Sequence, residues 1–409
     1  MLIDPLMKEY GWSRSVTTLP ASVNMFVFGF TGPFAAALMV RFGLRKVVSA
    51  SLATIALGAL AGTQATSPWH LVIAWGVIMG LGMGCTATVL ASSVANTWFV
   101  AKRGVVTGVL VASGTAGQLI FIPLNRWLIS TFSWRAANVV IALTTCAAIV
   151  MVGLFLVNRP EDKGLKAYGA PDSYEGHQRP SNPLAQAFGG LREAWTSGMF
   201  WILWGSFFVC GVTTGGLIQT HWFESTADHG IARATAGTLL VAIGICDLLG
   251  SLGSGWLTDR YDPRYLLFAY YSLRGLSLFA LDRVLNLGAS SVGLLVVVAF
   301  YGLDWVATIP PTIALATRVF GPQRGSIVYG WLFAGHQLGG AFAAWAAAAS
   351  RDWTGSFRLA YVVGGVMCMI AAFGVLRISI PSTPTLGAPD TRVNNRTKRN
   401  LEPVATATT

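Results

Sequence analysis

Eleven long apolar segments decide what this chain can fold into. About 20 consecutive apolar residues in a helix cross the ~30 Å hydrocarbon layer of a bilayer. Only 11% of the residues are charged and 54% are hydrophobic, whereas soluble domains carry about 25% charged residues. The sequence therefore predicts an all-α polytopic membrane protein. Its apolar segments lie at about 16–40, 46–66, 70–96, 104–130, 135–157, 198–222, 234–257, 265–285, 291–315, 325–349 and 356–378.

Lysines and arginines predict which side of the membrane each loop faces. Nineteen of them fall in one alternating set of loops, in the polar stretch 158–196 and after the last segment, and eight fall on the other side. Because the more basic side of a membrane protein is the cytoplasmic one, we expect a multi-pass protein of the cell membrane. The stretch 158–196 is then a cytoplasmic linker, and the Pro/Thr/Asn-rich stretch 379–409 a disordered cytoplasmic tail. The net charge of +11 follows from this asymmetry, which argues against binding to nucleic acid.

The two halves of the chain repeat one another. Four arginines recur at a nearly constant offset of 219 to 223 residues. A steady offset of this kind is typical of a transporter built from parallel repeats. We expect two pseudo-symmetric helix bundles, at 1–157 and 197–378. The recurring pairs are Arg41 and Arg260, Arg45 and Arg264, Arg103 and Arg324, and Arg135 and Arg358.

The same offset predicts a further helix ahead of the N-terminal bundle. The segment 198–222 opens the second bundle, and its counterpart would begin some 20 residues before Met1. We therefore expect a plan of twelve membrane helices, of which this sequence holds eleven. On that expectation the bundle 1–157 lacks helix 1, and an upstream extension would carry an apolar segment.

Two loops share a short pattern of charged residues. The first is Arg-Phe-Gly-Leu-Arg-Lys at 41–46, and the second is Asp-Arg-Tyr-Asp-Pro-Arg at 259–264. The pattern resembles the loop signature of the major facilitator superfamily, which lies in the cytoplasmic turns between helices 2 and 3 and between helices 8 and 9. Val40 stands where the family usually has Asp, which implies a weaker latch in the N-terminal copy. The resemblance implies gating and conformational roles for Arg41, Gly43, Arg45, Asp259, Arg260 and Arg264.

Within that superfamily the chain resembles the monocarboxylate and oxalate–formate transporter group. The resemblance is carried by Gly-Trp-Ser-Arg at 11–14, Trp-Arg-Ala at 134–136 and Arg-Pro-Glu-Asp-Lys-Gly at 159–164. Animal members carry Gly-x-x-Asp-x-x-x-Arg in helix 8, and Gly244 and Asp247 match its first two positions. Ser251 stands where the Arg would be. The resemblance therefore implies a role in proton coupling for Asp247 and does not provide the family's carboxylate-holding Arg.

Four ionisable residues are predicted at one depth near the middle of the membrane. They are Asp247, Arg274, Asp304 and His336, with Gln337 beside the last. One charge at this depth costs ~2.5–3.5 kcal/mol on insertion scales, so such residues usually pair and mark functional sites. We expect one cluster, in which Arg274 binds one or both carboxylates. A carboxylate left without a cation is then expected to bind a proton.

Each of these residues also has a purely structural interpretation. Arg274 could form an ion pair with Asp304 or Asp247 that only stabilises the fold, and His336 could only hydrogen-bond between helices. Two amides of the N-terminal half, Gln118 at mid-membrane depth and Asn24 somewhat off it, could bind substrate or join neighbouring helices. The sequence leaves these alternatives open.

We expect a secondary active transporter of small organic anions, with monocarboxylates as the expected class, coupled to protons and working by alternating access. The alternatives are an efflux carrier of apolar or aromatic compounds, an anion exchanger, and a non-transporting receptor or scaffold. No nucleophile–base pair, HExxH, Walker or Rossmann pattern points to an enzyme. The five cysteines lack CxxC spacing, so we expect no metal site and no cofactor. The expected partners are a small organic anion, a proton and the lipid bilayer, and we expect a monomer.

Overall fold

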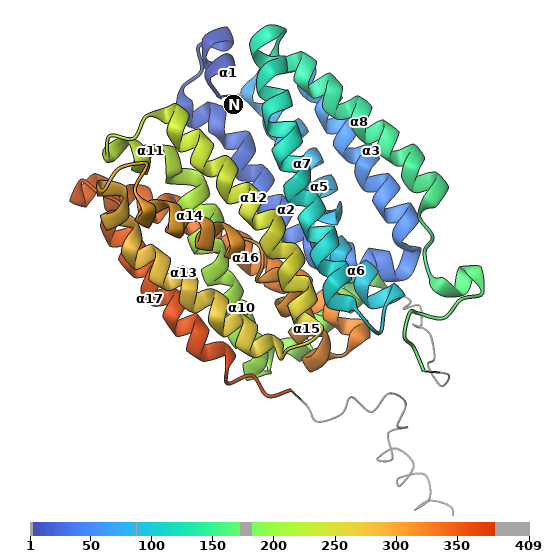
Figure 1. Cartoon of the computed structure of the whole chain (residues 1–409). Helices are drawn as coiled ribbons and strands as arrows, with labels where there is room; N and C mark the ends of the chain where they lie inside the picture. The colour runs from blue at the N-terminus through green and yellow to red at the C-terminus, as the bar shows by residue number, and fades with distance from the viewer. Residues whose placement is uncertain (1–2, 87, 172–181, 381–409) are drawn as a thin grey trace, which may run out of the picture.

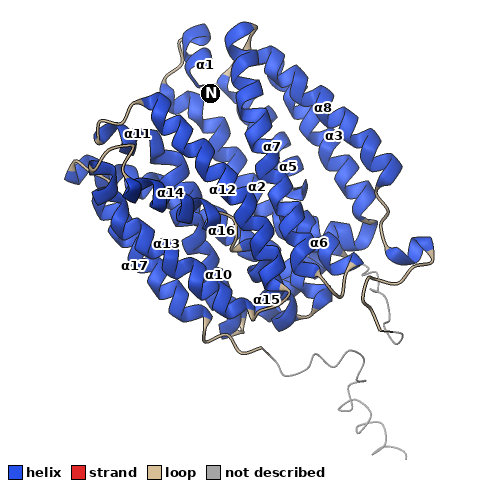
Figure 2. Ribbon diagram, viewed as in Figure 1, coloured by secondary structure: helices blue, strands red, loops and turns tan. Residues whose placement is uncertain are grey.

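The computed structural model describes residues 3–86, 88–171 and 182–380 as helices joined by short turns (Figure 1). Coloured by secondary structure, the described residues show helices and loops throughout (Figure 2). Of the expected tail at 379–409, residues 381–409 lie outside the described part. All eleven predicted segments coincide with helices, so the predicted all-α fold is confirmed.

The N-terminal half runs from α1 to α8. A short helix, α1, precedes the first long one, and one predicted segment is built from α4, η1, α5 and α6 in succession. The elements are α1 (Ile3–Tyr10), α2 (Arg14–Phe42), α3 (Leu44–Thr63), α4 (Pro68–Leu71), the π-helical stretch η1 (Val72–Met79), α5 (Gly80–Thr86), α6 (Thr88–Trp98), α7 (Arg103–Thr131) and α8 (Trp134–Phe155).

The linker and the C-terminal half are also built from helices. The linker contains η2 (Pro160–Lys163) and α9 (Pro183–Trp195). The C-terminal elements are α10 (Gly198–Gly211), the π-helical stretch η3 (Val212–Gln219), α11 (Thr220–Asp228), α12 (Arg233–Thr258), α13 (Pro263–Asn286), α14 (Val292–Asp304), α15 (Ile309–Phe320), α16 (Pro322–Thr354) and α17 (Arg358–Val375).

Nine helical stretches of the described chain are long and apolar enough to cross a membrane. The two further predicted segments form α13 and α16, which are also long but carry more polar residues, among them Arg274 and His336. Several helices begin at a side chain that accepts a hydrogen bond from a free backbone N–H group, as helix starts require. These N-terminal caps are Ser13, Ser133, Asn182, Asp262 and Ser291.

The two halves meet along two pairs of helices. α7 lies along α12, as Figure 1 shows, and α2 lies along α16. Glycines allow the close approach: a Cβ atom on Gly104 would lie 2.4 Å from the carbonyl oxygen of Gly255, and one on Gly330 would lie 2.5 Å from the nitrogen of Pro33. Small residues at such contacts let helix backbones touch. The interface between the halves is therefore tight on both sides.

The helix α1 covers one end of the N-terminal half. Its Leu6 is buried against Leu71 and Trp134. Glu9 forms an ion pair of 2.8 Å with Arg135 and accepts a hydrogen bond of 2.6 Å from the indole of Trp134. These hydrogen bonds, that of Arg135 first, hold the pKa of the Glu9 carboxyl below its usual value. The linker lies at the opposite end of the molecule (Figure 1), and we call the two ends the α1 end and the linker end.

Candidate functional site

Asp247 lies where the two halves meet. It is on α12 and is 3% exposed. Its Oδ2 accepts a hydrogen bond of 2.7 Å from the Thr115 hydroxyl on α7, which belongs to the other half. Its Oδ1 accepts from the backbone N–H of Val306 at 2.9 Å and from the Ser251 hydroxyl at 3.3 Å. The carboxylate therefore joins α7, α12 and the stretch that follows α14.

A cavity of about 220 Å³ opens beside this carboxylate. It is bounded by α7, α12, the end of η3 and the residue after α14. The amides of Gln118 and Gln219 and the carboxyl of Asp247 are its main polar groups, and no lysine, arginine or histidine is among the described residues that line it. The remaining lining is mostly apolar: Leu119, Ile122, Pro123, Leu240, Val241, Ile243 and Trp305.

The helix predicted at 291–315 is interrupted at 305–308, where α14 has ended and α15 has not begun. Pro310 and Pro311 open α15. Proline has no N–H group, so Pro310 and Pro311 leave the carbonyl oxygens of Val306 and Ala307 without their usual helical donors and favour an interruption here. The predicted segment still forms one candidate span, Val292–Phe320, and the interruption inside it was not predicted. The two prolines were the sequence signal that could have shown it.

Arg274 lies behind this break, away from the cavity. It is 0% exposed. Its Nε lies 2.5 Å from Asp304 Oδ2, and its Nη2 donates to the carbonyl oxygens of Asp304 and Trp305 at 2.7 and 3.2 Å. Its Nη1 lies 3.1 Å from the sulfur of Cys210. The guanidinium is thus enclosed within the C-terminal half.

The structure separates the cluster predicted from sequence into three parts. Arg274 pairs with Asp304, and among the described residues neither forms an ion pair or hydrogen bond with Asp247. The His336 ring is parallel to that of Phe333 and tilted against that of Phe207, and its Nδ1 lies 3.3 Å from Gln337 Oε1. Equal depth in the membrane therefore did not bring all four ionisable groups into direct contact.

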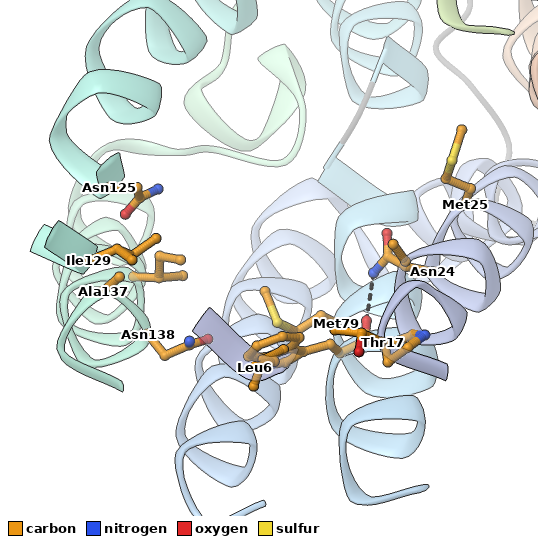
Figure 3. Close-up of a pocket in the computed structure, with 13 residues that line it drawn as sticks. Leu6, Thr17, Asn24, Met25, Met79, Asn125, Ile129, Ala137 and Asn138 are labelled. Atoms are coloured by element: carbon orange, nitrogen blue, oxygen red, sulfur yellow. Dashed lines mark hydrogen bonds between the residues drawn. The ribbon is translucent and has the colours of Figure 1, made fainter. Parts of the chain in front are cut away.

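The two amides predicted in the N-terminal half have different surroundings. Gln118 lines the cavity beside Asp247. Asn24 donates a hydrogen bond of 2.6 Å to the carbonyl oxygen of Trp75, which joins α2 to η1. It also borders a separate, mostly apolar cavity of about 490 Å³ between α2, η1, α7 and α8. Figure 3 shows Asn24 on one side of this cavity and Asn125 and Asn138 on the other.

At the linker end Asp259 joins the two halves. Its Oδ1 accepts a hydrogen bond of 2.7 Å from the backbone N–H of Gly104, and its Oδ2 accepts one of 2.9 Å from that of Val105. Both groups belong to the first turn of α7, where free N–H groups and the helix dipole favour a carboxylate. Sequence reasoning singled out Asp259 but not its partner on α7.

The other residues of the loop pattern contact their own half. The guanidinium of Arg260 lies 3.7 Å from the ring centre of Trp256. Arg264 binds Asp262 and the carbonyl oxygen of Ile378. Burial raises the pKa of the Asp262 carboxyl, but the hydrogen bonds from Arg264 and the positive charges of Arg264 and Arg318 together hold the pKa below its usual value.

The N-terminal copy of the pattern closes the turn between α2 and α3. Gly43 adopts φ of 90°, a conformation that favours glycine, and the backbone N–H of Arg45 donates to Asn158 Oδ1 at 2.9 Å. The guanidinium of Arg41 lies 5.5 Å from the ring centre of Phe42. These contacts shape the turn within the N-terminal half.

A second contact between the halves lies nearby and was not predicted. Asn96 on α6 donates to Ser326 Oγ on α16 at 2.9 Å and accepts from the Thr317 hydroxyl on α15 at 3.1 Å. The hydroxyls of Ser92 and Ser326 lie 3.1 Å apart. All four side chains are buried. Serine, threonine and asparagine are common in membrane helices, so nothing in their spacing marked this contact.

Two repeated helix bundles that meet at one end and hold a buried carboxyl beside a cavity at their interface are the architecture of a secondary transporter. The chain belongs to the Major Facilitator Superfamily, whose model matches residues 1–227 and again residues 223–405. The predicted family is thereby confirmed, and the members of this family are transporters rather than enzymes.

Curated relatives agree with this placement. Monocarboxylate transporter 13 of Rattus norvegicus is 26% identical over 392 residues, which cover 91% of this chain and 85% of the relative. A Mycobacterium tuberculosis protein described as "Probable nitrate/nitrite transporter NarK2" is 30% identical over 301 residues, covering 70% of this chain and 68% of the relative.

Solved structures share the fold. The E. coli fucose:proton symporter FucP superposes with a TM-score of 0.63 at 14% identity, covering 91% of this chain and 93% of that one. A double-tryptophan variant of XylE gives a TM-score of 0.70 at 14% identity, covering 94% and 92%. At this level of identity the likeness extends to the fold alone.

The contact of Asp259 gives a first prediction. Asp259→Ala removes two charge-assisted hydrogen bonds to α7 without touching the cavity. We expect transport to slow about tenfold or more while substrate affinity stays within a few-fold, since hydrogen bonds to a charged group contribute about 1.5–3 kcal/mol each. Initial uptake rates and substrate protection in binding assays measure the two quantities. Asp162→Ala, an exposed acid of the linker, is the matched control, and a loss of binding with normal turnover would place Asp259 in the substrate site instead.

Proposed function

We propose that this protein carries monocarboxylates with an apolar body across the membrane together with protons. The observation that supports this most is the position of Asp247, a single buried carboxyl at the wall of the cavity between the halves. The curated relatives that are monocarboxylate transporters support the same class of substrate. Asp247 would take the proton, and the amides of Gln118 and Gln219 would donate hydrogen bonds to the substrate carboxylate.

The absence of a cation from the described lining of the cavity explains why the proton would be required. An anion that entered beside an ionised Asp247 would face an uncompensated like charge in a desolvated site, which is costly. Once Asp247 is protonated, its carboxyl can donate a hydrogen bond to the arriving carboxylate. Substrate and proton would therefore bind together, and neither would cross alone.

The lining also supports a choice among anions. Leu119, Ile122 and Leu240 offer apolar surface for an aliphatic or aromatic body. An inorganic anion such as nitrate cannot use that surface, and a dicarboxylate would bring a second charge without a partner. We therefore place monocarboxylates above inorganic anions as substrates, even though one relative bears a nitrate/nitrite description.

The charge of the loops supports an orientation. Arg41, Lys102 and Arg260 lie at the linker end, which would face the cytoplasm by the positive-inside rule. The contacts of Asp259 and Asn96 then close the cytoplasmic side, so this structure would represent a state that is shut toward the cytoplasm of the cell membrane.

Uptake into proteoliposomes tests the proposal. The full chain is reconstituted, and uptake of pyruvate, phenylpyruvate, succinate and nitrate is followed with and without an acid exterior. We expect pyruvate and phenylpyruvate to accumulate only with the pH gradient. Phenylpyruvate should reach half-maximal uptake at a lower concentration than pyruvate. Uptake that does not depend on the pH gradient would point to exchange or efflux. A preference for nitrate or succinate would contradict the proposal that monocarboxylates are the substrates.

A further inference from the structure

The break at 305–308 and the helix α15 that follows it connect the candidate proton site to the closed linker end. We propose that residues 305–320, here called the coupling segment, move when Asp247 gains or loses its proton and thereby change the contact between Thr317 and Asn96. Thr317 is on this view a positioning residue for transport. The inference rests on the proposed role of Asp247 and adds to it the path by which that role reaches the gate.

The first end of the coupling segment is held by side chains in addition to two backbone turn hydrogen bonds, from Trp305 to Gly302 and from Ile309 to Val306. Asp247 accepts from the N–H of Val306, and the Ser254 hydroxyl donates to the carbonyl oxygen of Ala307 at 2.5 Å. Arg274 binds the carbonyl oxygens of Asp304 and Trp305 from the opposite side. Buried backbone groups without helical partners need such replacements. Of the three residues that hold the break, Asp247 is the one that lines the cavity.

The second end of the coupling segment takes part in the interface between the halves. Thr317 lies in the last turn of α15, and its hydroxyl donates to Asn96 Oδ1 on α6. Asn96 holds Ser326 of the C-terminal half at the same time. The helix α15 has 12 residues, which span about 18 Å. Because a short helix moves as one body, a change at the break displaces Thr317.

Protonation of Asp247 supplies that change. The oxygen that faces α7 across the interface is Oδ2, while Oδ1 holds Val306. Hydrogen bonds to a charged acceptor are roughly twice as strong as those to a neutral one, so a proton on the carboxyl weakens the hold on Val306. The charged groups behind the break are Arg274 and Asp304, which pair with each other, and α7 presents the uncharged Thr115. An ionised Asp247 thus keeps the linker end closed, and a protonated one releases it.

A cysteine at the closed end measures this release. Ser93 is buried and borders a small cavity at the linker end together with Asn96 and Ser326. Ser93→Cys is made in a background in which the exposed Cys146 is replaced by serine, and the full chain is labelled with a polar maleimide in nanodiscs at acid and at neutral pH. Rates are divided by those of free N-acetylcysteine with the same maleimide at the same pH, which removes the effect of pH on thiol reactivity.

The coupling segment predicts a specific set of rates. The reporter protein should label faster at acid pH, and Asp247→Asn should label fast at both pH values. Thr317→Val should raise the rate at neutral pH about five-fold, the effect of losing one buried hydrogen bond, and so remove most of the pH dependence. Thr317→Ser keeps the hydroxyl and should behave like the reporter protein. Thr226→Val removes a buried hydroxyl at the α1 end that bonds within its own helix and is the matched control.

The outcomes separate the two proposals. If the reporter protein and Asp247→Asn behave as expected while Thr317→Val keeps the full pH dependence, or changes no more than Thr226→Val, the coupling segment is overturned and the proton site stands. If the reporter protein shows no pH dependence and Asp247→Asn has no effect, the proton site and the inference built on it both fail. Should Thr317→Val give no monodisperse protein, Thr317→Ala carries the same expected rates.

Discussion

Replacing Arg274 with alanine is expected to remove most of the folded protein. The substitution leaves Asp304 as a buried charge without its partner and leaves two carbonyl oxygens at the helix break without a donor. Removing one member of a buried ion pair costs about 3–5 kcal/mol, a large share of a total stability of about 5–15 kcal/mol. The yield of monodisperse protein and its thermal unfolding in detergent measure the loss. Arg283→Ala, an exposed arginine of the same helix, should leave both unchanged.

A paired substitution distinguishes this structural role from the substrate-binding role considered from sequence. In Arg274→Met with Asp304→Leu no buried charge is left unpaired, and apolar replacements of buried ion pairs are often tolerated. We expect the double variant to recover much of the folded protein and to transport measurably. A double variant that folds well but no longer binds substrate would instead show that Arg274 serves as the counter-charge of the anion.

Replacing Asp247 with asparagine is expected to abolish accumulation driven by a pH gradient while substrate exchange continues. Asparagine resembles the protonated acid in shape, and its oxygen can still accept from Val306 while its amide reaches Thr115. The anion can then enter without a like charge opposing it, but no proton travels with it. Uptake against a concentration gradient and counterflow of labelled substrate measure the two activities in the same vesicles.

The matched control for Asp247→Asn is Asp352→Asn, an exposed acid near the α1 end. It should accumulate substrate as the parent protein does. If Asp247→Asn still accumulated substrate with an unchanged number of protons, Asp304 or His336 would have to carry the proton. If it lost exchange as well, the carboxylate itself would be needed for binding or for the change of conformation.

The sequence by itself determined those properties that depend on position along a helix. Eleven apolar segments, the asymmetry of basic loops and the offset near 220 residues were enough to predict two repeated bundles. The depth of Asp247, Arg274 and Asp304 in the membrane followed from the rise of about 1.5 Å per residue. Asp259 could be singled out because its loop pattern is a short local feature.

Only the tertiary structure decided which of these residues meet. A side chain turns about 100° around the helix with each residue, so its direction depends on how each helix is rotated and packed, and depth does not reveal it. Arg274 therefore forms its ion pair with Asp304 rather than with Asp247, and the ring of His336 packs against that of Phe207. The partners Thr115 and Thr317 look like ordinary membrane threonines until α7, α12 and α15 are brought together. Asp247 likewise gained its contact with Val306 only because α14 ends at Asp304, which leaves the backbone N–H of Val306 without a helical acceptor.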